Sequence, residues 1–154
     1  MANSNARGTL SKSDGRSEGT VDTVPHVSSS SIKSSSTSAG IGYATGAGST
    51  VTQQTNRTTG VTINNICGTI TTNNASLAAE ATADFVVTNS AVAITDVVVV
   101  SIQSGSNGGG TIVTVAAVAA GSFTIRVHNG NVAAGTAETG AILINFAVIK
   151  SVAA

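Results

Sequence analysis

Four acidic side chains are the groups in residues 41–154 that could support acid–base chemistry: Glu80, Asp84, Asp96 and Glu138. Glu80 and Asp84 lie close in the sequence, and glycoside hydrolysis uses two neighbouring carboxyl groups, one as proton donor and one as nucleophile or base. Sites of that kind normally carry aromatic platforms for the sugar, whereas Tyr43 is the only Tyr or Trp in this chain. We therefore expect no catalysis by this pair.

The histidines, the cysteine and the serines offer no better catalytic or metal-binding set. His26 and His128 lie far apart in the sequence, and together with Cys67 they do not form the three- or four-ligand pattern of a zinc site. A Ser–His–Asp arrangement could be assembled with His128 and Asp96, but no nucleophile-elbow or oxyanion-hole pattern accompanies them. We expect Cys67 to be a small buried hydrophobe. The sequence predicts no enzyme, no cofactor and no metal.

A glycine-rich stretch over residues 39–48, AGIGYATGAG, has glycine spacings found in some phosphate-binding loops. Such a loop needs a hydrophobic strand before it and a helix after it. Here a serine tract precedes the stretch and Thr-rich strand patterns follow it. A hinge or a close-packed turn is the better interpretation.

Composition limits the partners that the chain can have. Charged residues make up 9% of the 154 residues, against roughly 25% in typical soluble domains. The formal net charge is zero, so the chain has no electrostatic footprint for nucleic acid or an anionic membrane. No apolar run approaches the roughly 20 residues of a membrane-spanning helix, and residues 1–7 lack the apolar region of a secretory signal. We expect the protein to be made in the cytoplasm.

Residues 1–40 differ in composition from the rest and predict a flexible, extended low-complexity arm. Half of the charged residues and a serine tract fall in this stretch, which has few large apolar side chains. Such a segment buries too little surface to offset the entropy lost on ordering. It is either a solvated tail or an arm that orders against a partner, with Thr20–Val27 as the docking piece.

Residues 41–154 predict a single all-β domain. In residues 122–128 the side chains of Phe123, Ile125 and Val127 alternate with Thr124, Arg126 and His128, which is typical of a strand with one buried face. The expected strands span residues 50–53, 60–63, 68–72, 82–89, 95–102, 111–115, 122–128 and 141–149. We expect residues 95–102 to form a central strand buried on both faces, and residues 75–81 to form a loop. About eight short strands predict an antiparallel β-sandwich, jelly-roll-like in its connections.

Residues 42–154 resemble a C-terminal module of small virion structural proteins of tailed bacteriophages. The resemblance rests on residues 42–63 (GYATGAGSTVTQQTNRTTGVTI), 68–79 (GTITTNNASLAA), 85–90 (FVVTNS), 118–127 (VAAGSFTIRV) and 144–150 (INFAVIK). These motifs are structural, so the resemblance transfers no active-site residues. It covers about 110 residues and leaves the arm outside.

The resemblance implies a role in assembly rather than catalysis. It suggests a capsid decoration or head-fibre subunit on the exterior of the virion, attached to the major capsid protein through the arm of residues 1–40. It also implies a symmetric homo-oligomer, with a trimer as the first choice. The alternative is a tail-fibre or receptor-binding module that contacts host cell-surface glycans through loops 105–110 and 129–135. A polysaccharide hydrolase is a third, disfavoured reading.

Overall fold

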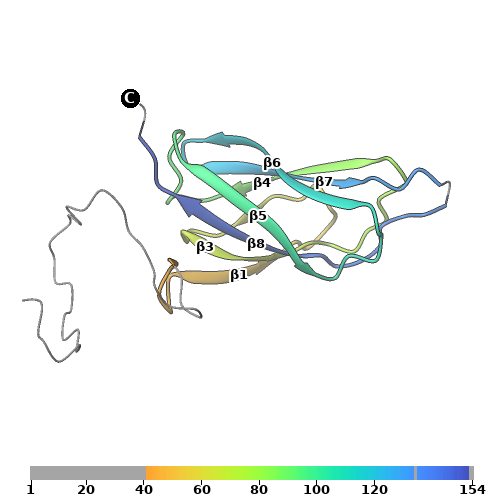
Figure 1. Cartoon of the computed structure of the whole chain (residues 1–154), viewed down its shortest axis with the longest axis horizontal. Coiled ribbons are helices and arrows are strands. Elements are labelled where there is room, and N and C mark those ends of the chain that lie inside the picture. Colours follow the sequence, from red (N-terminus) through yellow and green to blue (C-terminus); the bar gives the residue numbers. More distant parts are fainter. Residues whose placement is uncertain (1–40, 134, 153–154) are drawn as a thin grey trace, which may run out of the picture. The chain divides into compact units, whose positions relative to one another are not determined.

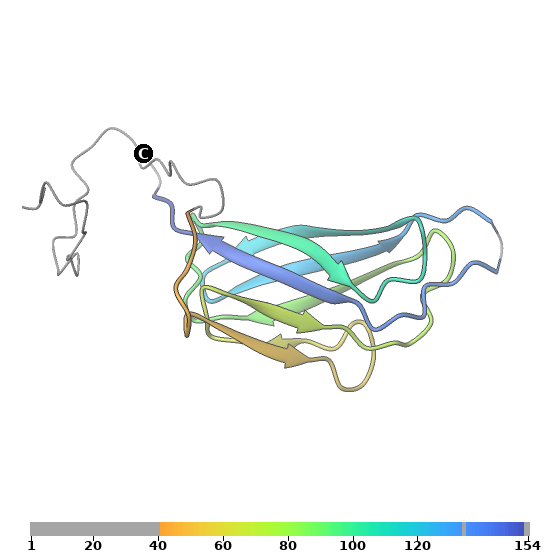
Figure 2. The ribbon, with the colours of Figure 1, turned by 60° about the horizontal axis from the view of Figure 1, so that its bottom comes forward.

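The computed structural model describes residues 41–133 and 135–152, so the predicted arm of residues 1–40 lies outside the described part. The described residues from Gly42 onward form one compact unit, and every regular element among them is a β-strand. Sheet A contains, in spatial order, β1 (Gly48–Thr52), β3 (Cys67–Thr71), β8 (Leu143–Ile149) and β5 (Val97–Ser104). Sheet B contains β2 (Val61–Thr62), β4 (Thr82–Thr88), β7 (Ser122–Asn129) and β6 (Thr111–Ala119). Figures 1 and 2 show the two layers.

The sheets are mixed, so the prediction of a purely antiparallel architecture is wrong. β1 pairs with β3 in parallel, and β2 pairs with β4 in parallel, while the other pairs are antiparallel. The cause is the path of the chain. Successive strands lie in alternate sheets, except that β6 and β7 are neighbours in sheet B. Two reversals of direction separate β1 from β3 and β2 from β4, so each of these pairs runs the same way.

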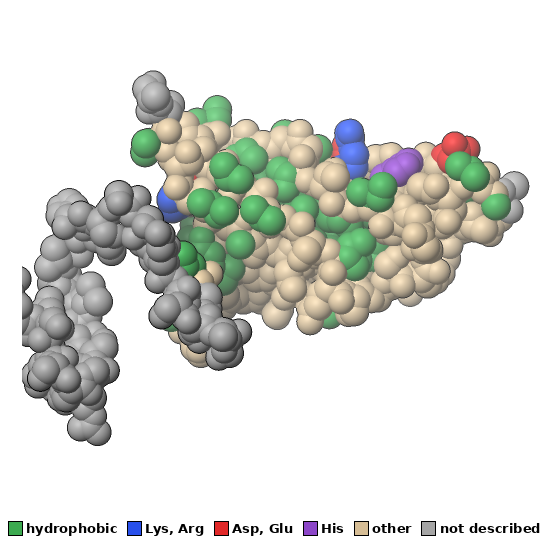
Figure 3. All heavy atoms as spheres, in the orientation of Figure 1, with side chains coloured by type: hydrophobic (Ala, Val, Ile, Leu, Met, Phe, Trp, Pro, Cys, Tyr) green, Lys and Arg blue, Asp and Glu red, His purple; other side chains and the backbone are tan. Residues whose placement is uncertain are grey.

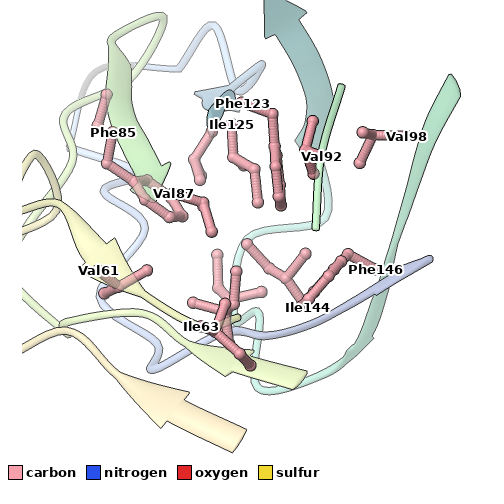
Figure 4. Close-up of a cluster of buried hydrophobic side chains, with 14 of the residues drawn as sticks. Val61, Ile63, Phe85, Val87, Val92, Val98, Phe123, Ile125, Ile144 and Phe146 are labelled. Atoms are coloured by element: carbon pink, nitrogen blue, oxygen red, sulfur yellow. The ribbon is translucent and has the colours of Figure 1, made fainter. Parts of the chain in front are cut away.

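The core lies between the inner faces of the two sheets. As predicted, Phe123, Ile125 and Val127 of β7 are buried. Phe146 of β8 meets Phe123 across the core, with ring centroids 5.4 Å apart and planes tilted by 47°. Figure 4 shows side chains from both sheets pointing toward one another. The core residues are Val61, Ile63, Ile70, Leu77, Ala83, Phe85, Val87, Val92, Val98, Phe123, Ile125, Val127, Ile142, Ile144, Phe146 and Val148.

The apolar run in β5 does not form a central strand, contrary to the sequence prediction. β5 lies at the edge of sheet A, bonded only to β8 within that sheet. Val98 is buried, but Val97 and Val99 are 52% and 49% exposed. A continuous run of valines carries no alternation, so the sequence does not show which side chains face outward.

The strand at residues 82–89, the segment 75–81 and Cys67 were also predicted from the sequence. The predicted strand at residues 82–89 forms β4, and Ala83, Phe85, Val87 and Asn89 are buried on one face. The segment 75–81 is a loop, also as predicted, with an isolated bridge between Leu77 and Glu138. Cys67 is the first residue of β3 and is only half-buried, so its predicted burial is wrong.

The described part of the chain has no helix with the length and apolar character that a membrane crossing requires.

We expect Phe123→Ala to lower the free energy of unfolding by about 3–5 kcal/mol, because it removes a fully buried ring and leaves a cavity between the sheets. The matched control is Val86→Ala, since Val86 points outward from β4 and is 48% exposed. Denaturant unfolding of both variants measures the effect. Equal losses in the two variants would contradict the assignment of inner and outer faces.

Candidate functional site

Four connections between the sheets meet at one end of the domain, which we call the loop end. They are the β1–β2 connection (residues 53–60), the β3–β4 connection (72–81), the β5–β6 connection (105–110) and the β7–β8 connection (130–142). The amide of Gly130 donates to the carbonyl of Gly110 at 2.9 Å, and the backbones of Leu77 and Glu138 exchange two hydrogen bonds of 2.9 Å. The structure thus joins, at Gly110 and Gly130, the two loops that the tail-fibre alternative offered as ligand contacts, residues 105–110 and the described part of 129–135.

The carboxylate of Glu138 is the centre of the loop end. Glu138 is fully buried, and five donors from the surrounding loops bond to its two oxygens. Oε2 accepts from Ser106 Oγ at 2.6 Å, Thr111 Oγ1 at 2.6 Å and the Gly108 amide at 3.0 Å. Oε1 accepts from the amides of Gly140 at 2.7 Å and Asn107 at 3.2 Å. One side chain therefore fixes both the β5–β6 loop and the turn at residues 138–140.

These bonds determine the ionisation of the group. Burial alone raises the pKa of the Glu138 carboxyl, but the hydrogen bonds from Ser106, Thr111, Gly140 and Asn107 outweigh it and lower the pKa to about 2, from an ordinary 4.5. Glu138 is therefore ionised at neutral pH. The Glu138 carboxylate therefore has a structural role. Its two oxygens already accept five hydrogen bonds, so a proton or a ligand could bind only by displacing one of them.

Arg57 supplies the nearby positive charge. Its side chain is buried, and the guanidinium donates to backbone carbonyls of Ala75, Glu138 (3.1 Å) and Gly140 (2.9 Å), and to Thr72 Oγ1 at 3.4 Å. Burial lowers the pKa of Arg57, and the charge of Glu138 acts in the opposite direction. Arg57 therefore joins the β3–β4 connection to the turn that carries Glu138.

Asn129 completes the polar network where β7 ends. It is fully buried, and its side-chain nitrogen donates to the carbonyls of Leu77, Ala78 and Thr136 at 2.8–3.1 Å. Its side-chain oxygen accepts from the amide and the side chain of Asn131. Within the described residues, no buried side-chain nitrogen or oxygen lacks a hydrogen-bond partner. The buried side-chain polar atoms of the loop end are thus satisfied by the fold itself.

Glu80 and Asp84, the two carboxyl groups that are close in the sequence, have different surroundings in the structure. Asp84 lies on the outer face of sheet B and forms a bidentate ion pair with Arg126. Arg126 Nε donates to Asp84 Oδ1 at 2.9 Å, and Nη2 donates to Oδ2 at 2.7 Å. The hydrogen bond from Arg126 is the main cause that lowers the pKa of Asp84. Glu80 occupies the turn before β4, with a φ of 58°. The carboxylate of Asp84 is thus held by Arg126, whereas the side chain of Glu80 is exposed on the turn.

The remaining candidates are also separate from one another. His128 and Thr82 share a hydrogen bond of 3.2 Å on the outer face of sheet B. Asp96 accepts from the amides of Ala93 and Ser151 and pairs with Lys150, and the first of these bonds is the largest cause of its lowered pKa. No three His, Cys, Asp or Glu side chains come close enough to hold a metal ion in residues 41–133 and 135–152. His26 lies outside the described residues.

Sequence reasoning missed the central roles of Glu138 and Arg57. Glu138 was noted only as one of the four acids, and Arg57 was not singled out. Each is an isolated charge in a stretch of Thr, Ala, Asn and Gly, close to a strand end. In a chain with so few charges, a single charged residue surrounded by small polar residues near a strand end is the sequence feature that could have indicated a buried charge bound by backbone groups.

Comparisons of the chain with protein-family models, with curated proteins and with solved structures gave no match.

We expect Glu138→Gln to destabilise the domain and to remove part of its acid sensitivity. The folded pKa lies below the unfolded value, so the carboxylate stabilises the fold above about pH 4.5, by roughly 3 kcal/mol, and this contribution is lost as the pH falls toward 2. The difference in unfolding free energy between the natural protein and the variant should therefore shrink between pH 5 and pH 2.

The control is Glu80→Gln, the same substitution at an exposed turn position, which should change stability by less than about 0.5 kcal/mol. Urea unfolding at several pH values measures both variants. A Glu138→Gln deficit that does not vary with pH would show that the carboxylate charge is not the stabilising feature.

Two glycines allow the loops around Glu138 to approach closely. A Cβ at Gly140 would lie 1.9 Å from the carbonyl oxygen of Gly105, and one at Gly105 would lie 2.1 Å from that of Ala141. Gly105 also has a φ of 85°, which disfavours residues with a side chain. The backbone at this point therefore excludes any side chain.

We expect Gly140→Ala to lower the melting temperature strongly, because the backbones of the two loops would have to move apart and strain the bonds to Glu138. Gly109→Ala is the matched control, since a Cβ there meets no atom within 4 Å. Thermal unfolding followed by circular dichroism measures both. Similar melting temperatures for the two variants would refute the close approach of the loops.

Proposed function

We propose that this protein is a bacteriophage virion structural protein: a capsid decoration or head-fibre subunit without enzymatic activity. The arm of residues 1–40 attaches it to the major capsid protein, and the β-domain forms a homo-oligomer, with a trimer as first choice, on the exterior of the head. The protein is made in the host cytoplasm and assembled on the particle. We include in this proposal the jelly-roll-like classification of the domain.

The observation that carries the proposal is that most of the domain's few charged side chains are engaged in contacts within the domain. Glu138 and Arg57 hold loops together, and Asp84 and Asp96 are bound to Arg126 and Lys150. These groups build a scaffold that engages three of the four acids, Asp84, Asp96 and Glu138. A scaffold of this kind, on an arm rich in serine and charge, suits a module that is displayed on a particle.

The resemblance of residues 42–154 to phage virion modules supports the same role. The quoted motifs map onto the strands that form the core, including β4, β7 and β8. Many weak contacts summed over a symmetric shell would give firm attachment without a large contact for each subunit.

Binding to purified tail-free heads tests the proposal. We expect full-length protein to bind saturably, and protein lacking residues 1–40 not to bind, because the arm makes the capsid contact. Circular dichroism of the truncated protein controls for folding of the β-domain. Absence of binding by the folded full-length protein would exclude the head function.

The second candidate is a tail-fibre or receptor-binding module that contacts host cell-surface glycans. The observation that favours it is the juxtaposition of loops 105–110 and 129–133 at the loop end, joined by the Gly130–Gly110 hydrogen bond. A module of this kind would bind host cells by itself and would not bind tail-free heads. The head-binding assay, run alongside binding to host cells, separates the two functions.

A further inference from the structure

Two Asn–Gly pairs lie at the loop end, Asn107–Gly108 and Asn129–Gly130, and they are the only two in the chain. In such a pair the asparagine side chain can lose ammonia without an enzyme, because a glycine leaves its own backbone nitrogen free to reach the preceding side chain. The loop end therefore contains the two sequences of this chain that are most prone to deamidation.

The reaction needs no reactant except water. The Gly108 nitrogen attacks Cγ of Asn107, so a bond from nitrogen to Cγ forms and the bond from Cγ to Nδ2 breaks. Ammonia leaves with the proton that the glycine nitrogen carried. Water then opens the five-membered succinimide ring at either carbonyl carbon, which leaves an aspartate or an isoaspartate at this position.

Packing requires the glycine of each pair. A Cβ at Gly108 would lie 3.0 Å from Thr111 Oγ1 and 3.2 Å from Glu138 Oε2. A Cβ at Gly130 would lie 2.8 Å from the carbonyl oxygen of Gly110. The fold thus imposes the reactive sequence, and the fold also has to protect it.

In the folded domain both reacting groups of the first pair are bound to other residues. The Gly108 nitrogen donates its hydrogen to Glu138 Oε2 at 3.0 Å. Asn107 Nδ2 donates to Thr139 Oγ1 at 2.7 Å, and Asn107 Oδ1 accepts from the Thr139 amide at 3.0 Å. Attack on Cγ breaks the bond from Gly108, and departure of Nδ2 breaks the bond to Thr139. Because its pKa is lowered to about 2, Glu138 is too weak a base to remove the amide proton.

The second pair is bound differently and provides an internal reference. Asn129 is fully buried, its Nδ2 donates to three backbone carbonyls, and the Gly130 nitrogen donates to the carbonyl of Gly110 at 2.9 Å. None of these bonds involves the Glu138 carboxylate. Asn107, in contrast, is exposed. In the orientation of Figure 3, uncharged polar side chains and backbone form most of the surface toward the loop end, which water can reach.

We propose that Asn107–Gly108 is a modification site that the fold protects. It stays unreacted while the Asn107 side chain is bound to Thr139 and the Gly108 nitrogen to Glu138, and it forms a succinimide when the β5–β6 loop opens. Opening of this loop is sufficient, because the bonds that protect the pair belong to two loops and not to a strand ladder. The proposal goes beyond the proposed function and does not depend on it.

The products prevent the loop from closing as before. In isoaspartate the backbone runs through the former side chain and gains a methylene group, so the amides of Asn107 and Gly108 no longer match the two oxygens of Glu138. In aspartate the donor to Thr139 is lost, and a second negative charge is added near Glu138. Each opening that leads to reaction is therefore recorded in the covalent structure.

The first test follows both asparagines in the full-length protein by peptide mapping with mass spectrometry, at one pH and temperature. We expect Asn107 to convert at least about tenfold more slowly in the folded protein than in urea, because reaction then requires an opening populated less than about one part in ten. Asn129 should convert in urea as well, which verifies that the unfolded pairs react. Equal rates at Asn107 in the folded protein and in urea would overturn the proposal.

The second test removes the side-chain bond alone. Thr139 is exposed, so its substitution leaves the core intact. Thr139→Ala deletes the hydroxyl that accepts from Asn107, whereas Thr139→Ser, the matched control, retains a hydroxyl. We expect conversion of Asn107 to be severalfold faster in the alanine variant than in the serine variant, with the rate at Asn129 unchanged. Equal rates at Asn107 in the two variants would contradict protection by Thr139.

The third test addresses Glu138. In Glu138→Gln we expect conversion of Asn107 to accelerate more than conversion of Asn129, because the carboxylate binds only the first pair. Equal acceleration at both sites would show that the whole domain opens and would remove the assigned role of Glu138. If this variant fails to fold, the Thr139 pair still decides the proposal.

The effect on loop closure is measured on aged Thr139→Ala protein. Converted and unconverted molecules differ by one negative charge and can be separated by ion exchange. We expect backbone hydrogen exchange in residues 105–111 to be faster in the converted fraction, since the bonds to Glu138 are disturbed. Equal exchange in the two fractions would show that the modified loop closes as before.

Discussion

The ionised carboxylate of Glu138 is the interaction on which the loop end of the domain depends. The chain passes between the sheets at almost every connection, and four of these connections meet at this end. Their backbones would place many amide groups away from water, and each buried donor without a partner costs about 1–3 kcal/mol. Glu138 accepts three of those amides and two hydroxyls, while Arg57 donates to the facing carbonyls. The carboxylate of Glu138 thus binds backbone amides of these loops, and the guanidinium of Arg57 binds their backbone carbonyls.

This use of charge explains how a domain with so few charged residues is held together. The core is built mainly from Val and Ile with three Phe rings, so its side chains gain less by burial than a core richer in large aromatic residues would. Buried amides such as Asn129 and Asn89 add hydrogen bonds at the strand ends. The charges are concentrated in the loops and on sheet B, and sheet A is left neutral on its outer face.

Sequence reasoning succeeded where alternation was clear and failed where it was not. In β7, apolar and polar residues alternate, and the buried face was predicted residue by residue. The apolar run of β5 was assigned to the centre of a sheet, yet it forms an edge, because a run of valines fits either position. The parallel pairs were missed because strand direction depends on which sheet each connection reaches. Glu138 was counted among the acids without a role, since its donors come from residues 106–111 and 140, which are distant or unremarkable in sequence.

The sequence by itself determined the all-β class, the number of strands and the inner faces of the alternating ones, because these follow from local periodicity and turn residues. It also determined that charge would be scarce. The tertiary structure alone decided the mixed sheets, the edge position of β5, the meeting of the loops around Glu138 and the continuous neutral face of sheet A. Each of these depends on contacts between residues far apart in the chain, whose pairing is set by the packing of two sheets around a shared core and not by any local pattern.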